Sequence, residues 1–369
     1  MTLRFEDVRW DGLFPRQPSG DDLPPPTELH RGRSVLVTGA GGSIGAALSR
    51  AIHRLQPRTL VLLDSSEQNL YHIHRALNPG ANPATIVPVL GSVADPNCLR
   101  EVFQRYRPFV IYHAAALKHV LLGELNPFAV MSNNVFGTAT LFGFAQEYGS
   151  ERLIMISTDK SVNPISIMGA SKRLAEIQLL LMQTRDTRMT SIRLGNVLGS
   201  EGSVVPLFLE QIARGGPVTV ADPDVERYFL TMEATVGRVL AAVADCQDEA
   251  LIAIPTMDEP VKIVDLARYL IAQAAAPEVA IRFTGLRHGD KLREEFVSAR
   301  ETAYAAECHG IQWFRSPAPL GSELAAGLAE LDRATADRDL RHVLATLVRL
   351  VPEYQPSDYL RQQAEMVAT

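Results

Sequence analysis

The chain has 369 residues, 46% of them apolar, and a formal net charge of -6 with acidic and basic residues interspersed. A chain of this length can bury a full core in one large domain or in two smaller ones. The charge balance argues against a nucleic-acid-binding protein, which needs a concentrated basic face, but a few well-placed groups can still hold a small anionic ligand.

The first thirty residues are predicted to lie outside the main domain. Residues 14–27 read FPRQPSGDDLPPPT, and such a proline- and acid-rich stretch is typical of a poorly structured leader or of an arm packed on the surface. We therefore interpret residues 1–30 as an N-terminal arm.

A regular alternation of strands and helices begins after Arg33. Short apolar runs with few interior polar residues predict strands that are buried on both faces. These runs are 34–39, 59–64, 85–91, 109–116, 152–158 and 190–199, and stretches with helical spacing separate them at about 44–55, 67–77, 96–105, 126–148 and 168–185. Alternation at this pitch predicts right-handed βαβ units and an α/β fold with a doubly wound parallel sheet, the Rossmann fold, over residues 31–200.

Beyond residue 200 the alternation becomes less regular. Helices are predicted at 203–213, 232–244, 261–273 and 340–350, and short strands at 218–221, 251–254 and 281–283. We interpret residues 201–320 as a smaller mixed α/β substrate-binding lobe that completes a cleft and interleaves with the last strands of the sheet. Residues 321–369 are predicted to form a helical C-terminal segment.

Cysteine and histidine spacing argues against disulfides and metal sites. The three cysteines, Cys98, Cys246 and Cys308, lie far apart without a CxxC pair, which is typical of a reduced, cytoplasmic protein. The nine histidines form no HExxH motif and no cluster at ligand spacing, so we expect no metal. No stretch approaches the ~20 apolar residues of a membrane span, and charges interrupt the N-terminus where a signal peptide is apolar.

The segment TGAGGSIG, from Thr38 to Gly45, follows the first predicted strand and begins the first helix. Glycines at this spacing permit a tight turn, a close approach of the backbone to a pyrophosphate and close helix packing, and the helix N-terminus adds N–H groups and a positive dipole end. Because the strand and the helix flank the loop as the motif requires, it predicts a dinucleotide site. The residues expected to face the cofactor are Gly39, Gly42, Ser43, Ile44 and Gly45.

Asp64 ends the second predicted strand, where a carboxylate would hydrogen-bond the ribose hydroxyls of the cofactor. Capping of the helix that begins near Glu67 is the alternative role. The following residues, SSEQNLY, bring no arginine to a 2′-phosphate, which favours NAD, with NADP as the alternative. Ser65 and Ser66 still offer hydroxyls to a phosphate.

Two later strand ends complete the predicted cofactor site. Ser92 and Val93, in GSVAD, are candidate adenine contacts. The small side chains of Ala114, Ala115 and Ala116, in HAAALKHV, would let the nicotinamide ribose lie against the backbone. Tight packing alone is an equally good explanation for these alanines.

An ordered series of motifs extends this pattern: TGAGGSIG, HAAALKHV, NNVFGT, STDKSVNP, MGASK, RLGNVLGSEGSVVP, RYFLT and GLRHGDKL. The series resembles the extended short-chain dehydrogenase/reductases, and more closely the soluble catalytic domain of the CapD-like polysaccharide-biosynthesis family, the UDP-N-acetylglucosamine 4,6-dehydratases. The resemblance covers residues 33–300, and STDK followed by MGASK is its most specific part. It implies a UDP-sugar substrate, an NAD(P) regenerated in each turnover and a homo-oligomer. Many members carry a membrane-spanning N-terminal half, whereas this chain resembles a soluble form.

The resemblance implies a reaction in three steps, for which residues 157–172, STDKSVNPISIMGASK, supply the groups. Hydride leaves sugar carbon 4 for NAD⁺, water is lost across carbons 5 and 6, and hydride returns to carbon 6. In the family pattern Asp159 is the acid for the leaving hydroxyl and Lys160 is the base at carbon 5. These roles require a raised pKa for Asp159 and a lowered pKa for Lys160.

Met168 occupies the position where most extended short-chain enzymes have the tyrosine that moves a proton in the first hydride transfer. A thioether has no proton to exchange. Either the protein is inactive, or the proton work moves to Lys172, Lys160 or Thr158, and members of the CapD-like family with methionine here favour the second alternative. By i,i+4 spacing Met168 and Lys172 share a helix face, with Met168 against sugar or nicotinamide and Lys172 on the ribose. Ordinary helix packing of Met168 is the other explanation.

The predicted substrate site depends on charge. Asn196, Arg227, Arg287 and Lys291 match family positions that contact the nucleotide diphosphate, and an arginine fork suits phosphate geometry. Lys118 faces either the cofactor or the sugar.

The sequence also departs from the family pattern, at Ser92, Leu121, His288, Asp290 and Arg293. These departures leave the sugar and the carbon-5 stereochemistry open. Two other functions therefore compete with the dehydratase: an epimerase, or dehydratase that also inverts carbon 5, and a non-catalytic protein that binds NAD and a nucleotide sugar.

Overall fold

The computed structural model describes residues 3–14, 28–77, 84–182, 184, 186–245, 251–317 and 321–366. The proline-rich residues 15–27 and Cys246 lie outside this set, so the leader prediction concerns residues that are not described.

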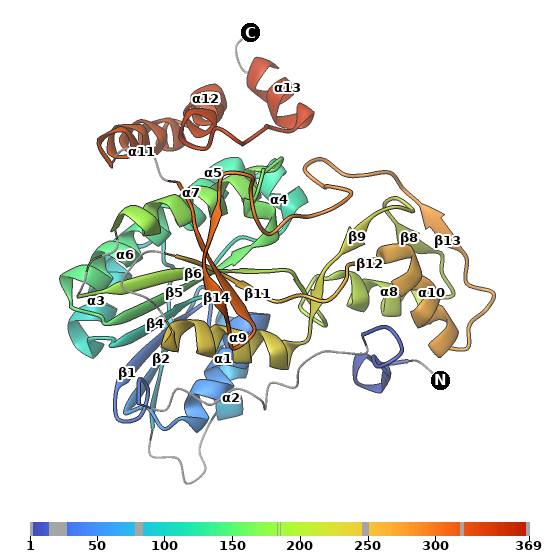
Figure 1. The fold of residues 1–369 in the computed structure, drawn as a ribbon, viewed down its shortest axis with the longest axis horizontal. Coiled ribbons are helices and arrows are strands. Elements are labelled where there is room, and N and C mark those ends of the chain that lie inside the picture. Colours follow the sequence, from blue (N-terminus) through green and yellow to red (C-terminus); the bar gives the residue numbers. More distant parts are fainter. Residues whose placement is uncertain are drawn as a thin grey trace.

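Nine strands of the described residues form one central sheet (Figure 1). In spatial order they are β3 (Thr85–Leu90), β2 (Thr59–Asp64), β1 (Ser34–Thr38), β4 (Val110–His113), β5 (Arg152–Thr158), β6 (Arg188–Leu194), β11 (Ile252–Pro255), β15 (Ile311–Arg315) and β14 (Thr302–Cys308). The pairs from β3 to β11 are parallel, and β15 and β14 close the edge in antiparallel fashion. The strand order reverses between β1 and β4, so the predicted doubly wound Rossmann fold is confirmed, and ligands bind at such a reversal.

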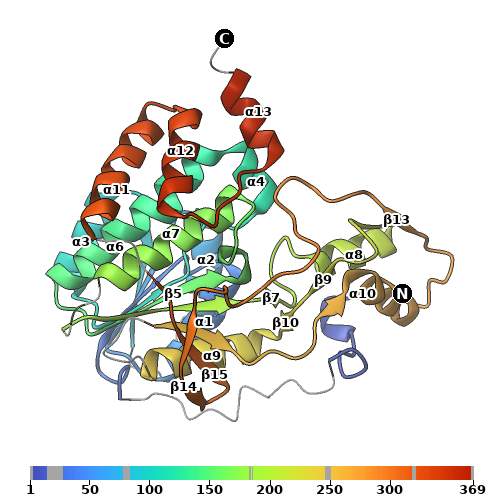
Figure 2. The same ribbon diagram turned by 45° about the horizontal axis from the view of Figure 1, so that its top comes forward.

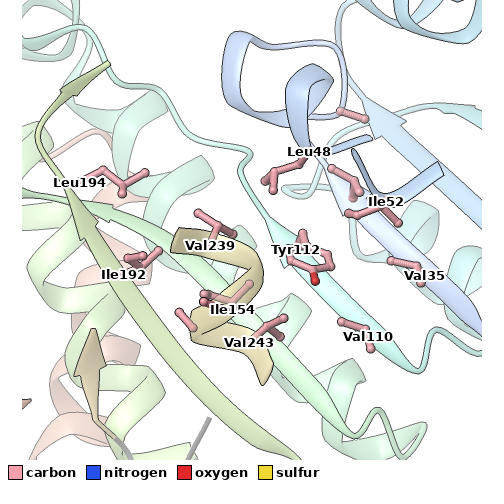
Figure 3. Packing of buried hydrophobic residues seen from close by; sticks show 14 of the residues in the cluster. Val35, Leu48, Ile52, Val110, Tyr112, Ile154, Ile192, Leu194, Val239 and Val243 are labelled. Atoms are coloured by element: carbon pink, nitrogen blue, oxygen red, sulfur yellow. The ribbon is translucent and has the colours of Figure 1, made fainter. Parts of the chain in front are cut away.

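Helices cover both faces of the sheet. One face carries α1 (Ser43–Arg54), α2 (Glu67–Leu77) and α9 (Met232–Ala244), and the other carries α3 (Pro96–Tyr106), α6 (Thr138–Glu147) and α7 (Ile167–Met182). Because successive strand residues point to opposite faces, Val35 packs with the first layer and Leu36 with the second. Figure 3 shows the first layer, where Val239 of α9 lies beside Ile154 of β5. Burial on both faces explains the continuous apolar runs.

The region predicted as one helix over 126–148 is interrupted. It consists of α5 (Pro127–Val130), a π-helical turn η3 (Met131–Gly137) and α6, and α4 (Val120–Leu125) precedes it. Apolar periodicity does not reveal a π turn, since the apolar side stays buried through it. Such turns often mark functional sites.

A second, smaller group of elements lies beside the carboxyl edge of the sheet (Figures 1 and 2). It contains α8 (Val204–Ala213), α10 (Ile263–Gln273) and the short strand pairs β7 (Asn196–Val197) with β10 (Phe229–Leu230), β8 (Val218–Val220) with β13 (Ile281–Phe283), and β9 (Glu226–Arg227) with β12 (Val261–Lys262). These elements share one hydrophobic cluster, and we call them the lobe. Since α9, β11, β14 and β15 return to the main sheet, the region after residue 200 contributes to both parts.

Residues 3–14 pack on the lobe and not on the sheet. Their short helix η1 (Phe5–Asp7) contacts α8, and Val8 and Phe14 are buried in the lobe cluster. A row of aromatic rings runs from Phe5 through Trp10 and Phe14 to Phe229 of β10, with centroids 5.6, 5.8 and 5.6 Å apart. This segment therefore completes the hydrophobic core of the lobe.

The C-terminal helices α11 (Gly321–Ala336), α12 (Leu340–Leu350) and α13 (Asp358–Met366) form a further layer over α5, η3 and α7. Figure 2 shows α11 and α12 lying alongside α7. Within the described part of the chain, no helix combines the length and the apolar character that a membrane crossing requires.

Candidate functional site

A cavity of about 810 Å³ lies along the carboxyl ends of the parallel strands and continues to the lobe. The strand ends meet at one edge because the strands are parallel, so loops far apart in the sequence line the same space. The predicted cofactor residues that line it are Gly39, Gly42, Ser43, Ile44, Gly45, Asp64, Ser65, Ser92, Val93, Ala114, Ala115 and Ala116. Their contacts with a cofactor remain a prediction.

The glycine loop is packed too closely for any larger residue. Gly39 has φ +63°, and a methyl group there would lie 2.7 Å from the backbone nitrogen of Ala115. A methyl group on Gly45 would lie 1.9 Å from the carbonyl oxygen of Gly39. The loop therefore brings the N-terminus of α1 close to the end of β1, as a pyrophosphate site requires.

Asp64 makes backbone contacts ahead of α2, and its contact with the ribose remains a prediction. Its Oδ1 accepts a hydrogen bond from the backbone N–H of Ser66 at 2.8 Å, ahead of α2, and its Oδ2 accepts one from Gly41 in the glycine loop at 2.8 Å. The carboxylate also lines the cavity. Two carboxylate oxygens offer about four acceptor sites, so both backbone bonds leave capacity for ribose hydroxyls.

The predicted catalytic residues lie at the end of β5 and in the 3₁₀ turn η4 (Asp159–Ser161), and we call this part the catalytic turn. Thr158 and Lys160 line the cavity, whereas Asp159 is completely buried beneath them. Asp159 Oδ1 accepts hydrogen bonds from Thr158 Oγ1 at 2.8 Å and from Lys160 Nζ at 2.9 Å. Asp159 is therefore connected to the cavity by its hydrogen bonds with Thr158 and Lys160.

The expectation of a lowered pKa for Lys160 is wrong for this structure. Burial by itself lowers the pKa, but the carboxylates of Asp159 and Glu294 outweigh burial and raise the pKa above its ordinary value. Lys160 Nζ lies 3.5 Å from Glu294 Oε1. Sequence reasoning missed Glu294, which directly follows the segment that resembles the family motif and lies 134 positions after Lys160, so local spacing does not reveal this pair.

Met168 and Lys172 lie one helical turn apart on α7, and both line the cavity. Burial lowers the pKa of Lys172 to about 8, with Glu176 only partly offsetting it. A buried amine with this pKa exchanges protons near neutral pH, as proton handling beside the methionine requires.

A buried ionic network supports the catalytic turn from below. Glu176 Oε1 accepts hydrogen bonds from Ser157 at 2.6 Å and from Ser161 at 2.9 Å, which flank the catalytic pair. The completely buried Arg193 joins Glu176 at 2.7 Å to Glu301 at 2.7 Å. Burial by itself raises the pKa of Glu176, but chiefly Arg193 lowers it to about 2. The sequence signal for Glu176 was its position four residues after Lys172.

Asn134 in the π turn is a second residue that sequence reasoning did not assign. Its side-chain amide accepts a hydrogen bond from the backbone N–H of Leu117 at 2.8 Å and donates one to the Leu117 carbonyl at 3.0 Å. It also donates to Ser171 Oγ at 3.0 Å. Asn134 therefore fixes the loop after β4 against α7, next to Lys172. The motif NNVFGT was the available signal.

At the lobe end of the cavity, the structure places Lys118, Asn196 and Arg227 on the lining. Lys118 Nζ donates a hydrogen bond to the carbonyl oxygen of Glu201 at 2.8 Å. Arg227 donates to three backbone carbonyls, those of Glu226 at 2.7 Å, Lys291 at 2.8 Å and Leu292 at 3.1 Å. Arg227 thus holds the segment after β13 in addition to facing the cavity.

Arg287 and Lys291 differ in position. Arg287 lines the cavity and pairs with Asp290, its Nε lying 2.9 Å from Asp290 Oδ2. Lys291 is not on the lining, because its Nζ donates a hydrogen bond to the carbonyl of Val162 at 2.7 Å. Lys291 therefore links this segment to the catalytic turn, and its predicted contact with the diphosphate remains a prediction.

Departures from the family pattern have local partners here. His288 stacks on Tyr359 of α13 with ring centroids 5.2 Å apart. Arg293 Nε lies 3.1 Å from Glu226 Oε1, and Ser92 Oγ accepts a hydrogen bond from the backbone N–H two residues later at 3.1 Å.

Comparison with known proteins decides the family. The polysaccharide biosynthesis protein family matches residues 35–315. The chain belongs to this family. The matched range contains the glycine loop, the catalytic turn and the segment with Glu294, so the resemblance to the CapD-like family is confirmed.

Two relatives within this group show how far the similarity extends. The capsular polysaccharide biosynthesis protein CapD of Staphylococcus aureus is 41% identical over 302 residues, 80% of this chain and 50% of that protein. The chain therefore spans about half the length of CapD. The UDP-N-acetylglucosamine 4,6-dehydratase (inverting) of Campylobacter jejuni is 31% identical over 283 residues, 74% of this chain and 80% of that protein.

Solved structures show the same fold. DesIV, a dTDP-glucose 4,6-dehydratase from Streptomyces venezuelae solved with NAD bound, superposes with a TM-score of 0.61 and 21% identity, covering 71% of this chain and 88% of that chain. At this identity the likeness concerns the fold alone.

Proposed function

We propose that this protein is an NAD-dependent nucleotide-sugar 4,6-dehydratase, and that its substrate is UDP-N-acetylglucosamine. One observation carries the proposal: Lys160, Met168 and Lys172 lie on a single cavity that extends from the glycine loop to the arginines of the lobe. The named relative in Campylobacter jejuni supports the choice of reaction and substrate.

The residues of the glycine loop fit NAD. The absence of side chains at Gly39 and Gly45 permits the close packing of the loop, β1 and α1 that a pyrophosphate site needs, and Asp64 retains acceptor capacity for the ribose. Bound NAD would supply the acceptor for hydride from carbon 4 and its return to carbon 6. Lys172 would hold the nicotinamide ribose beside Met168.

Proton transfers in this mechanism use the chain's own amines and carboxylates. Lys172, whose pKa is about 8, is placed to take the proton of the sugar 4-hydroxyl where other enzymes use a tyrosine. In the resting ion pair the proton is on Lys160, 2.9 Å from Asp159. Transfer of that one proton to Asp159 produces a neutral amine and a carboxylic acid, the two forms that elimination requires.

In the elimination step, the same pair supplies both the base, Lys160, and the acid, Asp159. The Lys160 amine takes the carbon-5 proton and becomes an ammonium ion. The Asp159 acid gives its proton to the Thr158 hydroxyl, which passes its own proton to the carbon-6 hydroxyl, and that hydroxyl leaves as water. The pair returns to its resting charges. When hydride returns to carbon 6, the Lys160 ammonium would protonate carbon 5, and the proton that Lys172 took from the 4-hydroxyl would restore Lys160 to its charged form.

The test is incubation with UDP-N-acetylglucosamine in deuterated water without added reductant, followed by NMR. A 4-keto-6-deoxy product with deuterium at carbon 5 is expected, and its ring configuration reports inversion or retention. A carbon-4 epimer would support the epimerase, and unchanged sugar that raises the melting temperature would support a binding protein.

Lys160→Ala should abolish turnover and leave bound NAD in place. Lys262→Ala, which removes an exposed lysine paired with Asp224 in the lobe, is the matched control and should turn over normally. Normal turnover by Lys160→Ala would contradict the role given to Lys160.

A further inference from the structure

Glu294 is a buried carboxylate surrounded by the charged groups of the site. Its side chain is 2% exposed, and its Oε1 lies 3.5 Å from Lys160 Nζ and 3.8 Å from the Arg227 guanidinium. Its Oε2 lies 3.6 Å from Lys291 Nζ. Three cations from three separate segments therefore converge on one side chain.

This carboxylate is not fully satisfied by hydrogen bonds. Glu294 Oε2 is buried without a hydrogen-bond partner among the described residues, and so is Asp159 Oδ2. An unpaired buried acceptor costs about 1–3 kcal/mol, and more when it is charged. Glu294 nevertheless retains its position among three cations, and this arrangement calls for a functional explanation.

Glu294 lies in a segment that contacts both β9 and the residue after the catalytic turn. Residues 291–294 are held to β9 by Arg227 and to the residue after the catalytic turn by Lys291. Arg287, which lines the lobe end of the cavity, lies in the same segment. Residues 287–294, which we call the substrate segment, therefore contact the catalytic turn at Glu294.

We infer that Glu294 is a positioning residue for Lys160: together with Asp159 it holds the ammonium group in the cavity wall and couples it to the substrate segment. The inference rests on the proposed function for the part that Lys160 plays in catalysis. The contact with Lys160 itself does not depend on the reaction.

The electrostatic consequence has a definite sign. A negative charge 3.5 Å away favours the ammonium form of Lys160, so a neutral amide at position 294 lowers the pKa of that lysine. Burial raises the pKa of Glu294 itself, Lys160, Arg227 and Lys291 lower it, and Asp159 raises it further. These four groups are the charged neighbours of Glu294.

Glu294→Gln keeps the shape of the side chain and removes its charge. Trace acetic anhydride, which acylates an amine only in its neutral form, would be added over a pH series, and the acetylated fraction of Lys160 measured by mass spectrometry. The pH of half-maximal labelling should fall by about one unit in Glu294→Gln. Glu294→Asp retains the charge and should restore the midpoint toward that of the parent protein.

Glu295→Gln is the matched control, because Glu295 is exposed and bonds Asn163 at 2.6 Å. Its midpoint should equal that of the parent protein. An unchanged midpoint in Glu294→Gln, or an equal shift in Glu295→Gln, would overturn the inference.

Turnover separates the two proposals. Where product forms, kcat should fall at alkaline pH as Lys160 loses the proton that it passes to Asp159. The pH at which kcat has fallen to half its plateau should be lower in Glu294→Gln, in step with the labelling midpoint. A uniform fall in kcat without that movement would indicate a merely structural role and overturn the inference. A shifted labelling midpoint in a protein that leaves UDP-N-acetylglucosamine unchanged would refute the proposed function and leave the Lys160–Glu294 coupling in place.

Discussion

The two ends of the cavity are built by different physical means. The cofactor end depends on backbone geometry, because Gly39 and Gly45 leave no room for a methyl group and Asp64 pairs with backbone N–H groups. All of these residues lie within the first two βα units. The cofactor end therefore does not accommodate a larger side chain at Gly39 or Gly45.

The catalytic end depends on paired charges that come from distant parts of the chain. Arg193 meets Glu301 across 108 positions, and Lys160 meets Glu294. These side chains are buried, so each charge relies on its partner for compensation. This end therefore tolerates no unpaired change in charge.

The largest effect is expected from breaking the ionic network. Arg193→Met is close in length but removes the cation between Glu176 and Glu301, which leaves these two buried carboxylates with Arg173 as their shared cationic partner, at 3.2 and 3.5 Å. Removal of one partner from a buried ionic group costs about 3–5 kcal/mol in the free energy of unfolding. Urea denaturation measures the loss. A loss below about 1 kcal/mol would show that the catalytic end does not depend on charge pairing.

A smaller effect is expected from a single methyl group at the cofactor end. Gly45→Ala places that group 1.9 Å from the Gly39 carbonyl, so α1 must move away from the loop. NAD affinity, measured by calorimetry, should fall by about tenfold or more, which equals about 1.4 kcal/mol. Gly143→Ala is the control, since its added methyl group meets no atom within 4 Å and should leave NAD binding unchanged. Equal affinities for the two variants would refute the size argument.

The smallest effect tests how far the lobe acts independently of the cofactor end. Trp10→Ala removes the middle of the aromatic row that supports β10 and, through it, Asn196 of β7. Loss of about 1 kcal/mol of aromatic contact should raise KM for the nucleotide sugar about fivefold without changing NAD affinity. Tyr71→Ala, at an exposed aromatic residue on α2, should change neither quantity. A parallel loss of NAD affinity in Trp10→Ala would mean that the two ends are not separable.

The same contrast explains what could be predicted from the sequence. The glycine loop, Asp64 and the strand–helix alternation were accessible because each depends on residues close together in the chain. The sign of the Lys160 pKa shift was missed because the carboxylates of Asp159 and Glu294 together outweigh burial, and only the tertiary fold brings Glu294 near. The network of Glu176, Arg193 and Glu301 escaped for the same reason.

Two misses concern local structure. The π turn at residues 131–137 has no signature in the apolar periodicity, although NNVFGT marked the place. The predicted strand over 190–199 is divided, because β6 ends at Leu194 and Asn196 begins a separate pair with β10. Its apolar composition does not distinguish one strand from two.

The contact between Arg9 and α10 affects the order in which parts of the protein can fold during synthesis. The backbone N–H and carbonyl of Arg9 both bond the amide of Gln273, at 3.0 and 2.9 Å, across 264 positions of the chain. At roughly 5–20 residues per second, the ribosome adds Gln273 on the order of 10–50 s after Arg9. Strands β1 to β6 emerge during that interval, so the sheet can form while the N-terminal segment still waits for its partner. The N-terminal segment therefore joins the hydrophobic core of the lobe late in translation.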